Sequence, residues 1–151
     1  MIRIICVGKL KEKYWVEALE EYKKRLQKFG NIELIEIPDE GIEDKVVALR
    51  KEKEKISKYI KPTDFLVTLE IDGKEYSSEE FAKLITKLEM TYYDITFLIG
   101  GSYGIDDEIK MRSNLKLSFS KMTFPHQMFR VMLLEQIYRA YKINAGESYH
   151  K

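Results

Sequence analysis

Three segments, each directly after an apolar run, carry the residues best suited to ligand binding. One is the glycine loop Gly100-Gly101-Ser102-Tyr103-Gly104, and another is the polar turn Ser120-Lys121-Met122-Thr123, followed by Phe124 and Pro125. The third is Leu69-Glu70-Ile71. Glycines let a ligand lie against bare backbone, and ligands of open α/β sheets bind outside the carboxyl ends of the strands. The three segments therefore predict one binding site, although the glycine loop alone is equally typical of a tight turn from strand to helix.

The glycine spacing restricts the kind of ligand. Gly-Gly-x-x-Gly differs from the G-x-G-x-x-G of dinucleotide folds, and the Gly-Lys-Ser/Thr ending of a phosphate-binding loop is absent from the sequence. A nucleotide- or flavin-binding protein is therefore the weaker interpretation. No G-x-S-x-G elbow supports a serine hydrolase either.

The two histidines lie far apart in the sequence. His126 follows Pro125 at the expected start of a helix, where a structural, hydrogen-bonded role is favoured over direct catalysis. His150 belongs to the final segment with Tyr149 and Lys151, which is chemically capable although terminal residues are usually frayed. No Cys/His/Asp cluster has the spacing of metal ligands, so we expect no metal site.

Strands and helices must alternate to position these segments. Apolar or alternating runs predict strands at 2–7, 32–37, 64–71, 94–99 and 115–119. Helical patterns lie at 15–29, at 42–60, after the capping box of Ser77 and Glu80, at a short acidic segment beginning at Asp106, and at 125–143. Asp72-Gly73 is interpreted as a turn. This order predicts one domain, residues 1–151, of class α/β with three layers and a mainly parallel sheet.

The final helix carries more apolar residues than one covered face requires, from Met128 to Tyr141. Because a helix outside a sheet needs a single apolar face, the surplus predicts a homodimer. Arg130 and Arg139 could point toward an anionic ligand, or form ordinary salt bridges with groups such as Glu135. Cys6 is interpreted as a small buried core residue.

Composition fits a soluble globular protein, with 44% hydrophobic and 34% charged residues. One cysteine and no long apolar run favour the cytoplasm and no membrane partner. Net charge is only +1, but residues 109–151 hold 8 Lys and Arg against 2 Asp and Glu, and residues 1–108 hold 18 against 23. This asymmetry hints at an anionic partner, with chance fluctuation as the alternative.

The segments VTLEI, FLIGGSYG and LSFSKMTFPHQMFRVMLLEQIYRA, with the closing YHK, resemble the bacterial ribosomal RNA large subunit methyltransferase H family. The resemblance covers the whole chain. It implies a SPOUT-class fold with a C-terminal trefoil knot, S-adenosyl-L-methionine as cofactor, a homodimer, and methylation of N3 of a pseudouridine in 23S rRNA within the assembled ribosome. The cofactor-binding positions that it implies are Leu69, Gly100, Phe119, Ser120, Lys121, Met122, Thr123 and Phe124.

The implied reaction gives the tail a function. N3 carries a proton in the neutral base, so a group must accept it as the methyl arrives. His150 is the best-suited base by residue type, since an unperturbed imidazole titrates near ~6.5, and Tyr149 would orient the nucleobase. We expect the tail to reach the cofactor of a partner subunit. A non-catalytic RNA-binding module that kept the fold is the competing hypothesis.

Overall fold

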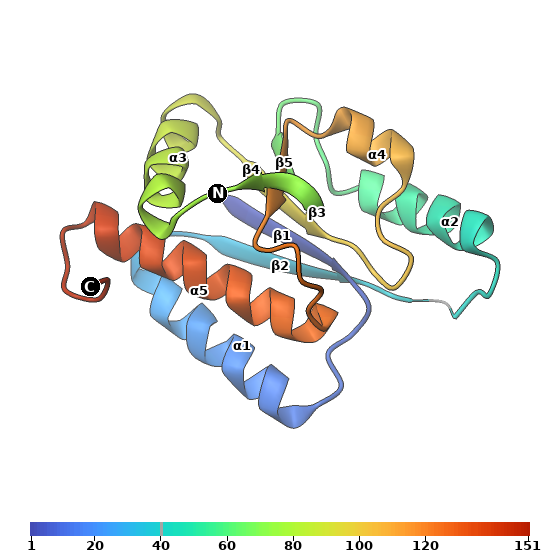
Figure 1. The fold of residues 1–151 in the computed structure, drawn as a ribbon, viewed down its shortest axis with the longest axis horizontal. Helices are drawn as coiled ribbons and strands as arrows, with labels where there is room; N and C mark the ends of the chain where they lie inside the picture. Colours follow the sequence, from blue (N-terminus) through green and yellow to red (C-terminus); the bar gives the residue numbers. More distant parts are fainter. Residues whose placement is uncertain (40) are drawn as a thin grey trace.

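The computed structural model describes residues 1–39 and 41–151, and its centre is a sheet of five parallel strands (Figure 1). Their order across the sheet is β2-β1-β4-β3-β5. The strands are β1 (Ile2–Val7), β2 (Ile32–Ile37), β3 (Phe65–Glu75), β4 (Ile95–Ile99) and β5 (Leu115–Ser118). All their pairings are parallel, which confirms the predicted sheet.

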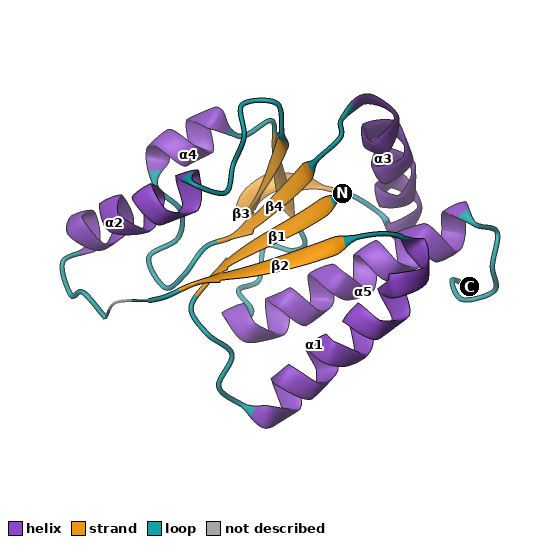
Figure 2. Cartoon of the chain, turned by 180° about the vertical axis from the view of Figure 1, so that it is seen from behind, coloured by secondary structure: helices purple, strands orange, loops and turns teal. Residues whose placement is uncertain are grey.

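Helices cover both faces of the sheet (Figure 2). One face carries α1 (Lys13–Leu26, continued by a 3₁₀ turn at Gln27–Phe29), α3 (Ser78–Thr91) and α5 (His126–Asn144), and the other carries α2 (Lys45–Ser57) and α4 (Asp107–Arg112). β1 is buried along its whole length, and its alternating side chains enter two cores. Ile4 packs in the core under α1, α3 and α5, whereas Ile5 packs in the core under α2 and α4. The three-layer prediction is confirmed, and the trefoil knot stays a prediction.

Capping side chains fix the starts of three helices, α2, α3 and α4, with Asp106 as the cap of α4. The Ser77 hydroxyl accepts a hydrogen bond from the Glu80 amide at 3.1 Å, and the Glu80 carboxylate accepts one from the Ser77 amide at 2.8 Å, as the sequence predicted. α2 is shorter than the predicted span of 42–60. Its first turn begins after Asp44, whose carboxylate accepts a hydrogen bond from the Val47 amide at 3.0 Å.

The turn predicted at Asp72-Gly73 is wrong, because β3 continues through both residues to Glu75. β5 pairs with β3 on both sides of a register shift between Leu69 and Lys74. A Cβ atom on Gly73 would lie 2.7 Å from the Lys116 carbonyl group. Gly73 therefore permits the close approach of two strands at an irregularity of the sheet. A glycine with this role and a glycine in a turn look the same in the sequence.

The surplus apolar surface of α5 has a partial explanation within the same chain. α5 packs against both α1 and α3 (Figure 1), and Leu133, Leu134 and Ile137 are completely buried there. Two neighbouring helices thus cover part of the apolar surface that the sequence pattern assigned to a second subunit. Met128 and Met132 remain half-buried. The homodimer stays a prediction, and the helical pattern alone does not require it.

The two arginines of α5 take different roles. Arg130 is buried, and its Nη2 donates to the carbonyl oxygens of Val7 at 3.1 Å and Gly8 at 2.7 Å. Its Nη1 donates to Glu36 at 2.9 Å. Arg139 pairs with Glu135 within the helix. Both arginines therefore form salt bridges within the chain, which was one of the two roles considered from the sequence. Arg139 pairs with Glu135 as suggested there, whereas Arg130 pairs with Glu36.

Cys6 is completely buried, as predicted, and burial raises the pKa of its thiol to about 12. A thiol rather than a thiolate is therefore present at pH 8, and thiolate is the reactive form. We expect native protein at pH 8 to react with a thiol reagent at least ~100-fold more slowly than protein in 6 M guanidinium chloride, with the reaction followed by absorbance. Equal rates in the two conditions would show that β1 opens readily.

Candidate active site

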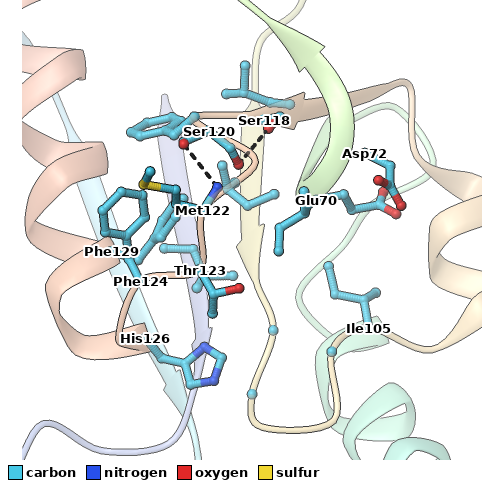
Figure 3. Close-up of a pocket in the computed structure, with 18 of the residues that line it drawn as sticks. Glu70, Asp72, Ile105, Ser118, Ser120, Met122, Thr123, Phe124, His126 and Phe129 are labelled. Atoms are coloured by element: carbon cyan, nitrogen blue, oxygen red, sulfur yellow. Dashed lines mark hydrogen bonds between the residues drawn. The ribbon is translucent and has the colours of Figure 1, made fainter.

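A cavity of about 320 Å³ opens beside the middle of β3 and at the carboxyl ends of β4 and β5 (Figure 3). Small-molecule sites have volumes of ~300–1,000 Å³, so the cavity is large enough for a ligand of that class. Three chain segments line it, and they are the segments that the sequence singled out. The lining residues lie at 69–72, at 99–101 with 104 and 105, at 117–120 and at 122–124, with Lys110, His126 and Phe129 added.

The glycine loop forms one wall from bare backbone. The Gly104 amide donates to the Gly101 carbonyl at 3.0 Å, and Gly104 has a φ of 84°, which favours glycine. A Cβ atom on Gly100 would lie 2.6 Å from the Gly104 carbonyl oxygen, and one on Gly101 would lie 2.9 Å from Val7 Cγ1. The loop folds back on itself at Gly100 and approaches β1 at Gly101, and both approaches depend on the absence of a side chain.

The segment after β5 forms the opposite wall and is shaped by local contacts. The Ser118 hydroxyl donates to the Ser120 carbonyl at 3.2 Å, and the Ser120 hydroxyl accepts from the Met122 amide at 3.0 Å. The ring of Phe129 on α5 contacts the rings of Phe119 and Phe124, with centroids 5.0 Å and 6.2 Å apart. These contacts hold the segment in a curve around the cavity (Figure 3).

Two carboxylates within β3 give the cavity an acidic side, a role that the sequence analysis did not assign to them. Glu70 accepts a hydrogen bond from the Thr68 hydroxyl at 2.6 Å, and the Lys110 ammonium lies 3.8 Å away. Asp72 lies beside Glu70 in the lining (Figure 3). The sequence contained a signal for Glu70, which directly follows Leu69 in one of the three candidate segments. Asp72 was not considered with it, because the turn predicted at Asp72-Gly73 placed Asp72 outside the strand.

His126 differs from its predicted structural role. Its side chain is exposed and lines the cavity beside Thr123 (Figure 3). Across residues 1–39 and 41–151, no hydrogen bond to its ring is found. The Pro125-His126 pair starts α5 with the proline as N-cap, and this geometry leaves the imidazole at the mouth of the cavity.

The predicted cofactor-binding residues are largely brought together. Lys121 is exposed and is not among the cavity-lining residues. The others lie in the wall: Leu69, Gly100, Phe119, Ser120, Met122, Thr123 and Phe124. Their part in binding a cofactor stays a prediction, because a cavity does not identify its ligand.

Tyr149 and His150 lie away from this cavity in the same chain. The Tyr149 hydroxyl donates to Glu135 at 2.6 Å, and the His150 ring contacts Glu79 and Arg139. Glu135 follows His126 by nine residues, which is about 14 Å along a helix axis. The hydrogen bond to Glu135 and burial raise the pKa of Tyr149 to about 12, so its hydroxyl stays protonated at neutral pH and acts as a donor.

Two features are absent from the described residues. None of their helices is both long and apolar enough to cross a membrane. Within the same ranges, no group of three or more His, Cys, Asp and Glu side chains could hold a metal ion.

Comparison with known proteins gives consistent matches along the chain. Residues 1–150 match the family described as Predicted SPOUT methyltransferase. A "Ribosomal RNA large subunit methyltransferase H" of Caldicellulosiruptor saccharolyticus is 51% identical over 155 residues, covering 100% of both chains. A protein of the same name from Clostridium novyi is 50% identical over 157 residues, covering 99% of both.

A solved structure supports the fold. The structure described as a probable methylase family protein from Haemophilus influenzae matches with a TM-score of 0.63, covering 99% of this chain and 70% of that one. At 12% sequence identity, this likeness concerns the fold alone.

Proposed function

Because the chain belongs to the SPOUT methyltransferase family, within the ribosomal RNA large subunit methyltransferase H group, we propose that it methylates N3 of a pseudouridine in 23S rRNA. The methyl donor of this proposal is S-adenosyl-L-methionine, and the substrate is the assembled ribosome in the cytoplasm. The observation that carries the proposal is the coincidence of the family's cofactor positions with one cavity. That cavity contains Leu69, Gly100 and most of the segment from Phe119 to Phe124.

The residues of the cavity fit such a cofactor. Bare backbone at Gly100 admits a flat group close to the chain, and Phe119 and Phe124 supply apolar surface. S-adenosylmethionine also carries a positive sulfonium and an ammonium group. Glu70 and Asp72 place negative charge on one side of the same cavity, with Lys110 close to Glu70. An acidic side complements a cationic ligand.

The chain's own residues must position the nucleobase and handle its proton. When bound, the cofactor supplies a methyl group on a positively charged sulfur. Transfer would form a bond between that carbon and N3 and break the carbon–sulfur bond, so the N3 proton must leave. His150 accepts this proton on a ring nitrogen, and Tyr149 orients the base through its protonated hydroxyl. The walls of the cavity exclude water and fix the line of approach.

A second subunit is part of the proposal. In one chain the tail lies on α5 and α3, away from the cavity. Tyr149 and His150 can therefore act only at the cavity of another subunit. A homodimer supplies one if the partner's cavity faces this side of α5. The basic segment 109–151 then contributes positive charge from both subunits. Because a near-neutral protein neutralises few phosphates, recognition depends on the shape of the assembled particle.

The test uses methyl-labelled S-adenosylmethionine with free 23S rRNA, separate large subunits, or whole ribosomes from cells lacking the modification. We expect label on whole ribosomes, at one pseudouridine, located by reverse transcription and nucleoside analysis. Calorimetry addresses the competing non-catalytic RNA-binding module, which predicts no heat of binding with S-adenosylmethionine. Binding without transfer to any of the three substrates would contradict the proposed activity.

Replacement of His150 tests the proton acceptor separately. We expect His150→Ala to reduce the single-turnover rate by about 10²–10⁴-fold, the range for a general base. Affinity for S-adenosylmethionine should remain unchanged, because His150 would contact the nucleobase and the substitution alters none of the residues that line the cavity. A wild-type rate in this variant would exclude His150 as the base.

A further inference from the structure

The carboxyl-terminal tail, residues 146–151, is held by charged and aromatic contacts at several points. Glu147 accepts from Lys28 at 2.9 Å and also pairs with Lys142. Tyr149 packs edge-on against Tyr138, with ring centroids 5.0 Å apart, and its ring lies under the Arg139 guanidinium at 4.6 Å. A frayed terminus would have none of these contacts, so the position of the tail is specified by its surroundings.

Glu135 is the centre of this arrangement. Its Oε2 accepts from Arg139 Nε at 3.1 Å, and its Oε1 accepts from Arg139 Nη2 at 3.1 Å. The same Oε1 accepts from the Tyr149 hydroxyl at 2.6 Å. A two-point contact between guanidinium and carboxylate fixes the plane of the guanidinium. Glu135 thus orients Arg139 and anchors Tyr149 at the same time.

The oriented Arg139 in turn determines the state of His150. Arg139 Nη1 lies 3.1 Å from His150 Nδ1, and His150 Nε2 lies 2.6 Å from Glu79 Oε1. A guanidinium has donors and no acceptor, so Nδ1 must accept. The neutral ring then carries its proton on Nε2 and donates it to Glu79. The basic lone pair of the imidazole is therefore on Nδ1 and faces Arg139.

We propose that Glu135 and Arg139 are positioning residues that hold Tyr149 and His150 in the geometry used for methyl transfer. This inference rests on the proposed catalytic part of those two tail residues. Neither Glu135 nor Arg139 lines the cavity, so both act through the tail. The pair sets the direction of the Tyr149 hydroxyl. It also makes Nδ1 of His150 the nitrogen that takes the proton, after Nδ1 exchanges its contact with Arg139 for a contact with N3 of the nucleobase.

The first arm of the test measures the tail without any methylation assay. In protein produced to end at Lys151, carboxypeptidase B removes this lysine, and its rate follows the population of undocked tail. We expect Glu135→Ala to release lysine about tenfold faster than the wild type, and Glu135→Gln to lie between them, because an amide oxygen still accepts from Tyr149. Glu89→Ala is the matched control, since Glu89 accepts from the Tyr141 hydroxyl at 3.2 Å elsewhere on the surface.

The second arm measures single-turnover methylation of ribosomes and the Kd for S-adenosylmethionine. We expect Glu135→Ala and Arg139→Lys to lower the rate by about 100-fold, with the Kd within twofold of the wild type. Lysine keeps the positive charge of Arg139 but lacks its planar fork of donors. A low rate in Arg139→Lys would therefore show that the geometry of the side chain matters and not its charge alone. If the wild type does not methylate, the proposed function fails and the first arm still decides whether Glu135 holds the tail. Lysine release equal to the wild type, or full activity in Glu135→Ala, overturns the inference.

Discussion

Replacing Gly100 with alanine is expected to abolish binding of S-adenosylmethionine, with a rise in Kd of at least ~100-fold, or about 3 kcal/mol. The added Cβ would lie 2.6 Å from the Gly104 carbonyl oxygen and 2.9 Å from Ile105 Cγ1. The first of these atoms is backbone, so the conflict cannot be relieved by a rotamer change. The glycine loop must shift, and it forms a wall of the cavity. Calorimetry with S-adenosylmethionine measures the effect directly.

Gly30→Ala is the control for this prediction. Gly30 has a φ of 137° and open space around its α-carbon, and it precedes β2 at the opposite edge of the sheet from the cavity. Alanine there strains the backbone and lowers the free energy of unfolding, but it should leave the Kd unchanged. If Gly100→Ala binds S-adenosylmethionine as the wild type does, the cavity is not the cofactor site.

Features that depend on local pattern were predictable from the sequence. The alternation of apolar runs and helical stripes identified each strand and each helix within a few residues, because burial on a sheet imposes these periods. The rule that ligands bind at the carboxyl ends of parallel strands then selected Leu69, Gly100 and the segment after Phe119. The cavity wall contains these residues.

Features that depend on contacts between distant residues were not predictable in the same way. Glycine at position 73 is compatible with a turn, and only the approach of Lys116 shows why a side chain is excluded there. The carboxylate partner of Arg130 is 94 residues away in the sequence. The apolar surplus of α5 could be counted, but the sequence does not say whether α1 and α3 or a second subunit covers it.

The tail illustrates the same limit for the candidate site. Residue type alone singled out Tyr149 and His150 as chemically capable. Their partners are Glu135 and Arg139 on α5 and Glu79 on α3, and the helical pattern gives no reason to connect these residues with the tail. In physical terms, a hydrogen-bond network is specified by distance and direction, and these are set only after α3 and α5 have packed together.

Arg130→Met is expected to lower the free energy of unfolding by about 3 kcal/mol, the lower end of the range for breaking a buried ion pair. Arg130 is 1% exposed, and its guanidinium binds Glu36 together with the carbonyl oxygens of Val7 and Gly8. Methionine fills much of the volume but leaves these acceptors without their donor. The expected loss of stability lies at the lower end of this range because the Glu36 side chain is 34% exposed and can be hydrated once Arg130 is removed. Urea denaturation followed by circular dichroism gives the measurement.

Arg25→Met provides the matched control and Glu36→Gln the second half of a double-mutant cycle. Arg25 forms an exposed pair with Glu21 at 3.9 Å and lies over the rings of Tyr22 and Tyr138 at 5.1 Å and 5.7 Å, so its loss should cost about 1 kcal/mol, clearly less than the loss of Arg130. In the Arg130→Met background, Glu36→Gln should recover part of the loss, because the amide carries no charge to leave unpaired. Should Arg130→Met fail to fold, Arg130→Lys, which keeps the charge and loses the fork, still tests the contact. A loss below ~1 kcal/mol in Arg130→Met would mean that the link between α5 and the end of β1 does not support the fold.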